Sequence, residues 1–272
     1  MGRDFSQYKN NNNLLKSPYD PRDFKLSKSI PLAAMSALPD EYETPEAPFV
    51  YDQGSSSMCC ACAYSMLRYL QESDTENGGS GLDEPLSPAF TYANRLPGED
   101  FEGMFIRSCC KKGTDGSVLY SDFPGFMSYF AAKQQFNRNK QALLEKALPF
   151  AITSYHQCDK REAMMAAIMS SKGVLGGIPI YQCMYDLKGD VLKYDPNKNT
   201  QDFGGHAILF VGWKTINGKF HWRIQNSWGA DWGKNGRAWI PEEYPWVENP
   251  YAIIDGNVDL IFEDYKKQYC KY

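Results

Sequence analysis

Hydrophobic positions follow two different spacings along the chain. Between about residues 57 and 155 they recur at helical intervals, whereas after residue 173 they fall into short apolar or alternating runs. Ser55, Ser56 and Ser57 are candidate N-cap residues for the clearest helix. Its apolar side chains share one face, and they are Cys59, Cys62, Ala63, Met66, Leu67 and Leu70. Further helices are expected near residues 87–94, 124–133, 138–147 and 159–170.

Strand signals dominate the last third of the chain. The runs GVLGGIPIYQ (173–182), HAILFVGW (206–213) and FHWRIQN (220–226) are short and rich in apolar residues. Asn217-Gly218 signals a turn between the last two runs. A helical half followed by a sheet half predicts an α+β fold, in which functional sites often lie in the cleft between the halves.

The first 50 residues differ from the rest. Residues 1–16 are polar and rich in asparagine, so we expect a flexible segment. Residues 17–50 contain six prolines, which exclude long helices and predict an extended strap over the surface. The remaining domain boundaries follow from the helical and strand-like spacings of the hydrophobic residues. We expect one domain over 51–265, with a helical half at about 51–155 and a sheet half at about 156–265, and a C-terminal tail at 266–272.

Composition narrows the possible functions. The chain has 272 residues, of which 43% are hydrophobic, enough for one large domain or two closely packed subdomains. The net charge is −4 and the basic residues form no long run, so we expect no nucleic-acid and no membrane partner. No apolar run approaches the roughly 20 residues of a membrane-spanning helix. The N-terminal sequence also has no apolar signal core, and we expect a cytoplasmic protein.

The chain has eight cysteines. Without a secretion signal we expect them to be mostly reduced, buried thiols. Cys59 and Cys62 form one CxxC pair, but no second pair has the spacing of a zinc site, and the adjacent Cys109 and Cys110 cannot supply one. We therefore expect no metal or other cofactor.

His206 is the best candidate for a base among the three histidines. If the strand that begins at His206 returns through a five-residue loop centred on Ile216, His206 lies opposite Asn226. A two-residue turn at Asn217-Gly218 would shift the partner by three positions, about 10 Å along the strand. We expect the longer loop. His221 alternates with the apolar side of the returning strand, so we expect it to face solvent.

A thiol at the start of a buried helix and an imidazole oriented by an amide together form a nucleophile–base pair. The N–H groups at a helix N-terminus favour the thiolate of Cys59, and an adjacent imidazolium favours it further. An Asn oxygen that accepts from the ring fixes which nitrogen faces the sulfur. Gln53 lies just upstream and could donate its amide, with the backbone N–H of Cys59, to a developing oxyanion.

Three sequence blocks carry a resemblance to a known family. QGSSSMC (53–59), GGHAILFVGW (204–213) and QNSWGADWGKNG (225–236) resemble the motif blocks of papain-like cysteine peptidases, in which His and Asn follow the nucleophilic Cys by about 130–150 residues. Here His206 follows Cys59 by 147 positions, and Asn226 comes 20 later. PYDPRDF, LSPAFTY and AWIPEEY look like the bacterial and viral branch, which lacks the usual inhibitory helical propeptide. The resemblance covers about residues 17–262.

The resemblance implies a papain-like fold, with a helical subdomain, an antiparallel β-barrel-like subdomain and the active-site cleft between them. It implies that Cys59 is the nucleophile, His206 the base, Asn226 the group that orients the base, and Gln53 the oxyanion-hole glutamine.

Further positions match substrate-binding residues of the family. Trp228 would shield the Asn–His hydrogen bond and help to form the leaving-group side of the cleft, and Trp232 would pack close by. Gly103 resembles the glycine whose backbone pairs with an extended substrate, and Gly205 belongs to the block around the base.

The chain departs from the family around the nucleophile. Ser56, Ser57 and Met58 replace the usual cysteine, glycine and small residue, and Cys60 replaces the usual aromatic residue. Losing the cysteine at 56 removes a common disulfide, in line with a reduced compartment. Met58 is large for a position beside the oxyanion hole. We expect Cys60 to be a packing substitute and Cys62 to belong to the core.

These observations predict a cysteine peptidase that hydrolyses peptide bonds through a Cys-His-Asn site and a thioester acyl-enzyme. Its partners would be a peptide or protein substrate and, as one option, a protein inhibitor. One alternative is a papain-fold peptide-binding protein in which Met58 or the strap blocks turnover. Another is a thiol oxidoreductase that uses Cys59 and Cys62, which leaves Asn226 and the NSWG block unexplained. The N-terminal strap lacks a long charged helix that could lie backwards through a cleft, so we expect it to be structural rather than inhibitory.

Overall fold

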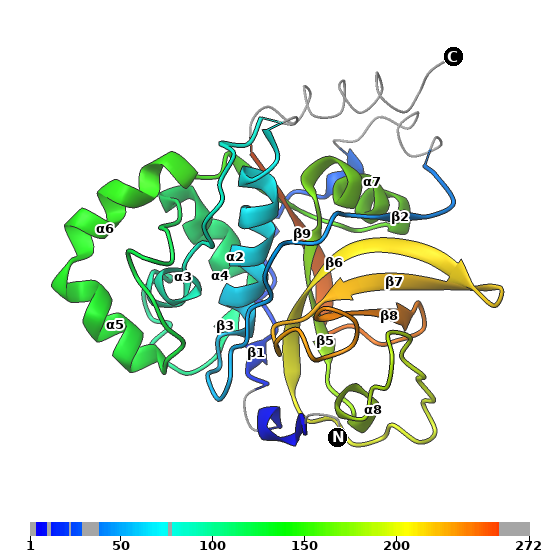
Figure 1. Ribbon diagram of the computed structural model, residues 1–272. Helices are drawn as coiled ribbons and strands as arrows, with labels where there is room; N and C mark the ends of the chain where they lie inside the picture. Colours follow the sequence, from blue (N-terminus) through cyan, green and yellow to red (C-terminus); the bar gives the residue numbers. More distant parts are fainter. Residues whose placement is uncertain (1–3, 10–11, 22, 29–37, 76–77, 256–272) are drawn as a thin grey trace, which may run out of the picture.

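The computed structural model describes residues 4–9, 12–21, 23–28, 38–75 and 78–255. The expected C-terminal tail at 266–272, the last residues of the expected domain and Cys270 lie outside these ranges. A helical half and a sheet half lie side by side (Figure 1). This is the α+β arrangement that the sequence predicts. No helix in the described ranges is both long enough and apolar enough to span a bilayer.

The helical half is built around α2. Within the described residues it contains α2 (Cys59–Glu72), α3 (Pro88–Ala93), α4 (Ile106–Lys112), α5 (Tyr129–Arg138) and α6 (Lys140–Ala147). Every residue of α2 except Gln71 is buried, because the helix packs against α3 and α4 and also against the sheet half. The sequence predicts one apolar face for this helix. The structure covers its other faces as well, as is usual for a helix at the centre of a fold.

Side-chain caps set the start of two helices. Ser87 accepts a hydrogen bond from the N–H of Phe90, and a proline follows at the first helical position of α3. Ser128 accepts from the N–H of Ala131, so α5 begins at Tyr129. The expected helix start near residue 124 is wrong, because Gly125 has a φ of +105°, outside the helical region.

The expected serine cap of α2 is also wrong. The residue before the helix is Met58, and it makes no side-chain cap. The hydroxyl of Ser56 instead donates to the carbonyl of Gln53, and the hydroxyl of Ser57 accepts a bond from the Asn13 amide. No neighbouring side chain therefore caps the N–H groups at the start of α2. These groups lie at the end of the helix that carries the Cys59 thiol.

The sheet half contains an antiparallel sheet with seven strands in the described part of the chain. Its order is β4-β9-β5-β6-β7-β8, and β2 pairs with β6 beyond the end of β5. Helix α7 (Arg161–Ser171) packs against β6 and β9, and the short α8 (Gln182–Tyr185) follows β5. The strands are β2 (Tyr42–Glu43), β4 (Ser154–Gln157), β5 (Val174–Pro179), β6 (Gly205–Ile216), β7 (Lys219–Gln225), β8 (Arg237–Pro241) and β9 (Glu248–Ile254).

The turn between β6 and β7 differs from the expected one. Ile216 pairs with Lys219, so the turn has two residues, Asn217 and Gly218. Their φ angles of +50° and +76° are the left-handed values that an Asn-Gly hairpin turn requires. The expected five-residue loop is therefore wrong.

A bulge partly compensates for the short turn. The pairing of β6 and β7 shifts by one position between Phe210 and Gly212. Beyond the bulge the last pair is Leu209 with Gln225, so Asn226 lies past the end of the paired strand. Asn226 comes close to the start of β6 because the chain leaves the ladder there, and not because of direct strand register.

His221 is buried, and the expectation that it faces solvent is wrong. Its Nδ1 lies 2.9 Å from the carbonyl oxygen of Lys219. The chain after β8 turns back over this part of β7, where the N–H of Glu242 donates to the carbonyl of Phe220. The alternation of polar and apolar residues shows which side chains share a face of β7. It does not show that a later segment of the chain covers the face that carries His221.

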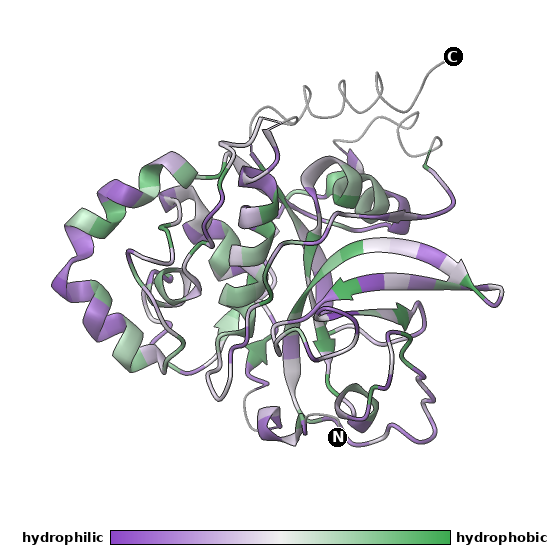
Figure 2. Cartoon of the chain, in the orientation of Figure 1, coloured by the Kyte–Doolittle hydropathy of each residue, from purple (hydrophilic) through white to green (hydrophobic). Residues whose placement is uncertain are grey.

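Two apolar clusters form the core. One joins α2 and the rest of the helical half to β6, and the other fills the space between the sheet and α7. Hydrophobic residues dominate the strands next to α2, whereas α5 and α6, on the outer side of the helical half, alternate between polar and apolar residues (Figure 2). Buried apolar residues of α2 and β6 thus pack against each other at the boundary between the two halves.

The described N-terminal residues pack against the rest of the fold. Residues 14 and 15 form β1 (Leu14–Leu15), which pairs in parallel with β3 (Met104–Phe105). Tyr8 and Leu14 are buried. The polar run thus contains apolar side chains that are buried in the fold, and the flexibility expected over 1–16 stays a prediction. The described part of the strap is mostly extended, and it contributes β2 to the sheet.

Candidate active site

His206 and Asn226 form a closely hydrogen-bonded pair. The imidazole Nε2 lies 2.8 Å from Oδ1 of Asn226. The backbone N–H of Ser227, which can only donate, reaches the same oxygen at 2.7 Å. Oδ1 is therefore the acceptor in both contacts. The neutral imidazole then carries its proton on Nε2, and its Nδ1 keeps a free lone pair.

The other ring nitrogen of His206 is buried and has no hydrogen-bond partner in the described part of the chain. Burial lowers the pKa of His206 to about 4, and the bond to Asn226 acts in the opposite direction. The imidazole is thus neutral at pH 7, with a buried lone pair that can accept a proton.

Cys59 is the first residue of α2, where the N–H groups of the helix favour an anion. Its sulfur also lies within hydrogen-bonding reach of the backbone N–H of Ala207, which follows His206 in β6. These contacts lower the pKa of the thiol, but burial is the larger effect and raises it to about 11. In this state both the thiol and the imidazole are neutral.

Gln53 is connected to the same group of residues. Its backbone N–H donates to the carbonyl of Ser227 at 2.9 Å, and its side-chain oxygen accepts from the Ser227 hydroxyl at 2.6 Å. Its side-chain NH₂ donates to the carbonyl of Ser56 at 2.9 Å. An amide nitrogen has two hydrogens, so one N–H remains for another acceptor.

The two unusual residues beside Cys59 point into the helical half. The sulfur of Met58 accepts a bond from the N–H of Met127 at 3.3 Å, which turns the long side chain toward residues 126–127. Cys60 is buried and forms a hydrogen-bond contact with Cys109. The packing role expected for Cys60 fits this contact.

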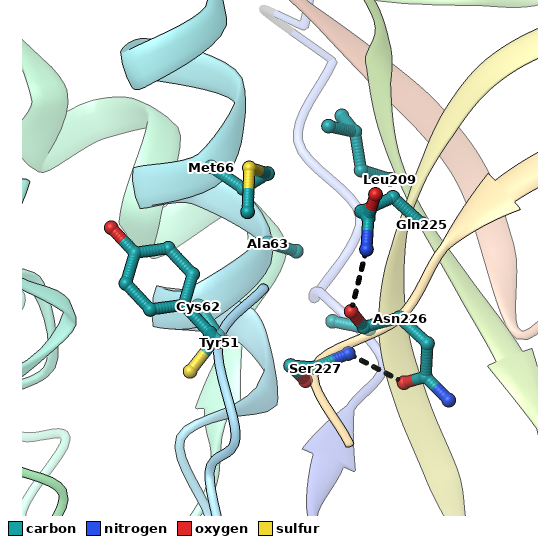
Figure 3. A pocket seen from close by; sticks show the side chains of 9 residues that line it. Tyr51, Cys62, Ala63, Met66, Leu209, Gln225, Asn226 and Ser227 are labelled. Carbon is teal, nitrogen blue, oxygen red and sulfur yellow. Dashed lines mark hydrogen bonds between the residues drawn. The ribbon is translucent and has the colours of Figure 1, made fainter. Parts of the chain in front are cut away.

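A cavity of about 10 Å³ lies behind Asn226, between α2 and the β6–β7 hairpin (Figure 3). Cys62 and Met66 line it from the helix, and Asn226 and Ser227 line it from the hairpin side. This volume is close to the minimum for one water molecule, so the cavity does not hold a substrate. Cys62 is therefore a core residue, as expected.

Trp228 lies beside the His–Asn pair. Its ring centroid is 5.1 Å from that of His206, and the ring is fully buried. It stacks on Tyr185 at 5.3 Å and on Tyr8 at 5.0 Å. Trp232 meets Trp228 edge to face at 5.9 Å. This arrangement keeps water away from the imidazole.

Two glycines leave room for a passing backbone. A Cβ at Gly103, whose φ is +87°, would lie 2.1 Å from the carbonyl oxygen of Asn13. A Cβ at Gly205 would lie 2.7 Å from the carbonyl oxygen of Leu14. Only glycine allows so close an approach at either position. The backbone that passes here is the chain's own N-terminal residues.

The whole group is sealed from solvent. Cys59 is 1% exposed, His206 0% and Gln53 1%. Across the described ranges, no three or more His, Cys, Asp or Glu side chains gather in a way that could hold a metal ion. The groups that meet at the site are a thiol, an imidazole and amides.

Sequence reasoning missed three residues around the site. Ser227 joins Gln53 to Asn226, and its place inside the NSWG block was a usable signal. Tyr185 and Glu248 had no such signal. No motif marks Tyr185, which comes near the site because of the way the chain folds. Glu248 is a half-buried carboxylate of β9 that accepts bonds from Ser17.

A comparison with known protein families identifies the family of this chain. A family model described as papain family cysteine protease matches residues 108–246, about half of the chain. The chain belongs to this family. The match contains His206 and Asn226, whereas Cys59 lies before it. The predicted family is confirmed.

This papain-family chain resembles several characterised relatives. It is 30% identical over 125 residues to the cathepsin B-like cysteine proteinase 4 of Caenorhabditis elegans, an alignment that covers 45% of this chain and 36% of the relative. The chain spans between 26% and 48% of the length of the curated relatives it matches.

Solved structures agree on the fold. Xylellain, a cysteine protease from Xylella fastidiosa, has a TM-score of 0.76 at 21% identity, with 94% of this chain and 99% of xylellain covered. Procathepsin B S9 from Trypanosoma congolense has a TM-score of 0.68 at 14% identity, with 93% and 88% covered. The predicted papain-like α+β fold is confirmed.

Proposed function

We propose that the chain is a cysteine peptidase in which Cys59, His206 and Asn226 act together. The observation that carries the proposal is the fixed tautomer of His206. Two donors meet at Asn226 Oδ1, so the imidazole presents an unprotonated Nδ1. A neutral imidazole with that nitrogen free can remove the proton of a neighbouring thiol.

In the first half of the reaction, the sulfur of Cys59 attacks a peptide carbonyl while its proton passes to Nδ1 of His206. The negative charge moves to the carbonyl oxygen, where the backbone N–H of Cys59 and the remaining side-chain N–H of Gln53 stabilise it. The C–N bond then breaks. The imidazolium gives its proton to the leaving amine, and a thioester remains on Cys59.

In the second half, water attacks the thioester. His206 accepts a proton from the water, and the C–S bond breaks with return of a proton to the sulfur. The products are a carboxylic acid and the free thiol. Asn226 holds the ring throughout, and Trp228 limits the access of water to their hydrogen bond.

The test is cleavage of a peptide library by the purified full chain in the presence of a thiol reductant, beside Cys59→Ala. We expect cleavage that depends on Cys59. Equal cleavage by both proteins would contradict the proposal, because the activity would then have another source.

A second function is favoured by one observation. The site is buried and both reacting groups are neutral in this state, as they would be in a peptide-binding protein without turnover. Labelling by a peptidyl electrophile separates the two functions, since selective reaction at Cys59 requires an activated thiol. The thiol oxidoreductase alternative has less support, because Cys62 lies in the core behind the site.

A further inference from the structure

The side-chain amide of Asn226 could face His206 in either of two orientations. When its oxygen faces the ring, the neutral imidazole carries its proton on Nε2 and leaves Nδ1 free for the thiol. With its nitrogen toward the ring, Nε2 would have to accept, and the proton would lie on Nδ1. Asn226 Nδ2 has no hydrogen-bond partner in the described part of the chain. Among the described residues, the backbone N–H of Ser227 therefore selects the first orientation, through its 2.7 Å bond to Oδ1.

The direction of that N–H depends on the peptide group between Asn226 and Ser227. The carbonyl oxygen of Asn226 belongs to the same planar unit and points the opposite way. It accepts a hydrogen bond from Nε2 of Gln225 at 3.1 Å (Figure 3). Because a bond to one end of a planar unit also holds the other end, Gln225 helps to set the direction of the N–H that orients the Asn226 amide.

The side-chain amide of Gln225 is itself fixed. Its Nε2 also donates to the carbonyl oxygen of Gly236 at 3.1 Å, so both of its N–H groups are used. Its Oε1 accepts from Nε of Arg237 at 2.8 Å. A guanidinium can only donate, so this contact excludes the flipped amide, in which Nε2 would face Arg237. The donors and acceptors from Arg237 to His206 thus have one consistent arrangement.

The fold brings these groups together at the end of the β7–β8 pair. Gln225 lies opposite Arg237 in that ladder, which places the two side chains on one face of the sheet. Gly236 has a φ of +73°, and a Cβ there would lie 2.8 Å from Nε2 of Gln225. Glycine at this position therefore leaves the room that Gln225 needs to reach the carbonyl of Asn226.

Arg237 is held on its other side by the strap. It is fully buried, and its Nη1 donates to the carboxylate of Glu43 at 3.1 Å and to the carbonyl oxygen of Thr44 at 2.7 Å. Its Nη2 donates to the carbonyl oxygen of Pro45 at 3.1 Å. A rigid, planar guanidinium with bonds on several sides has little freedom to turn. These bonds therefore fix the direction in which Nε points toward Gln225.

We propose that Gln225 and Arg237 are positioning residues, which hold the Asn226–Ser227 peptide group so that the proton of neutral His206 stays on Nε2. They act on the reaction through Asn226. The effect on turnover rests on the proposed peptidase function, whereas the effect on the tautomer does not. Residues 43–45 of the strap then have a part as well, as the outer support of Arg237.

The tautomer can be measured by NMR on protein labelled with nitrogen-15 histidine, at a pH at which the ring of His206 is neutral. The chain has three histidines, and the spectrum of His206→Ala identifies the signals of His206. We expect the wild type to show the Nε2–H form. In Gln225→Leu the Nδ1–H form should reach about a tenth of the population or more, because one hydrogen bond is worth up to about a factor of ten.

Kinetics supply a second readout. In Gln225→Leu we expect kcat for a fluorogenic peptide to fall about tenfold while KM stays within about twofold, because the base is misdirected and the contacts of the substrate are kept. Gln225→Glu should behave alike, since an ionised carboxylate accepts from Arg237 but cannot donate to Asn226. Arg237→Met should show the same pattern, and Arg237→Lys, which keeps a charged donor, should recover part of the loss.

Arg223→Met is the matched control. Arg223 is also a buried arginine of the sheet and also donates to Glu43, at 2.9 Å, but its guanidinium reaches Asp190 rather than Gln225. Its loss should lower the free energy of unfolding without moving the tautomer of His206 or kcat.

The two readouts distinguish the positioning role from the peptidase function. A changed tautomer in the folded Gln225 variants, beside a wild type that cleaves no peptide, would support the positioning role and contradict the peptidase. If His206 keeps the Nε2–H form in both Gln225→Leu and Gln225→Glu, with circular dichroism showing an intact fold, the positioning role is overturned, whatever the Arg237 variants do. It also falls if Arg223→Met moves the tautomer as far as Gln225→Leu, because the effect would then be a general response of the sheet.

Discussion

At the scale of single residues, the proposed chemistry depends on one oxygen atom. Oδ1 of Asn226 accepts from both His206 and the backbone of Ser227. The backbone donor fixes the orientation of the amide, and the amide then fixes the tautomer of the imidazole. In the proposed reaction, Asn226 therefore positions His206 and does not touch the substrate.

Replacing the two residues should give unequal losses. His206→Ala removes the base, and we expect turnover to fall by a factor of about 10² to 10⁴. Asn226→Ala leaves the base present but poorly oriented, so its loss should be smaller, with KM little changed. Turnover and the pH profile of thiol alkylation are measured together. If alkylation of the His206→Ala protein keeps the wild-type profile, His206 does not act on the sulfur.

The three clustered thiols should separate by role. Cys59→Ala should abolish turnover, because it removes the nucleophile. Cys60→Ala and Cys62→Ala should keep turnover within about twofold and lower the free energy of unfolding by about 1 kcal/mol, since both side chains fill the core. Urea unfolding and peptide cleavage check this. A folded but inactive Cys60→Ala protein, together with an active Cys59→Ala protein, would reverse the assignment.

At the scale of secondary-structure elements, the sequence predicted the helices and strands whose hydrophobic pattern is contained in a short stretch of the chain. The apolar spacing after Met58 was sufficient for α2, and the runs around His206 and Ile224 were sufficient for β6 and β7. Helix α4 is short and carries two adjacent cysteines and two lysines, so it has no clear periodicity. The bulge after Phe210 has no sequence signal of its own. It results from the way β6 meets its neighbours.

The same limit applies to the site. Asn226 lies 2.8 Å from His206 and Gln53 contacts Ser227, so the blocks QGSSSMC and QNSWG meet in the fold. The reasoning about the hairpin turn was wrong, and the roles of these residues stay predictions. The N-terminal contacts were out of reach, because Tyr8 and Trp228 are 220 positions apart in the sequence. Nothing local to an asparagine-rich run indicates that its few apolar residues have partners so far along the chain.

Glu248 in β9 should make stability depend on pH. Burial raises the pKa of this carboxyl from an ordinary 4.5 to about 7, although the bonds from Ser17 act in the opposite direction. Because the folded state binds the proton more tightly, this contribution is fully present below pH 4.5 and is lost as the pH rises through about 7. The loss amounts to about 3 kcal/mol at most.

Glu248→Gln tests this by removing the titration while keeping an acceptor for Ser17. The fall in unfolding free energy between pH 4.5 and 7.5 should be smaller in the variant than in the wild type, as measured by urea unfolding. Glu242→Gln, at a surface ion pair with Arg161, is the control and should keep the wild-type slope. An identical slope in the Glu248→Gln protein would mean that the carboxyl titrates as it does in the unfolded chain.

At the scale of the whole molecule, the two halves meet along α2 and β6. The N-terminal segment, residues 4–9 and 12–17, crosses that junction. The seven described cysteines are free thiols, and Cys59, the proposed nucleophile, is among the most buried of them. A covered thiol reacts more slowly with oxidants than an open one, because only the thiolate is reactive and burial disfavours it.

The rate at which Cys59 is oxidised should therefore show how well the N-terminal segment covers it. We expect hydrogen peroxide to inactivate Tyr8→Ala several-fold faster than the wild type, and a thiol reductant to restore activity after brief exposure, while oxidation has gone no further than the sulfenic acid. Residual turnover against time of exposure is the measurement, with Tyr19→Ala as the control, because Tyr19 is 91% exposed in the strap. Equal inactivation rates would indicate that the segment gives Cys59 no protection.

Trp228 also gives the molecule an optical property of its own. Its indole is stacked against two tyrosine rings, one from α8 and one from the N-terminal segment. Departure of residues 4–9 would exchange two aromatic neighbours of the indole, Phe5 and Tyr8, for water. Emission from this indole should then shift to longer wavelength. The wild-type chain thus carries an unlabelled fluorescent reporter for displacement of these residues, readable on the millisecond scale of a stopped-flow experiment.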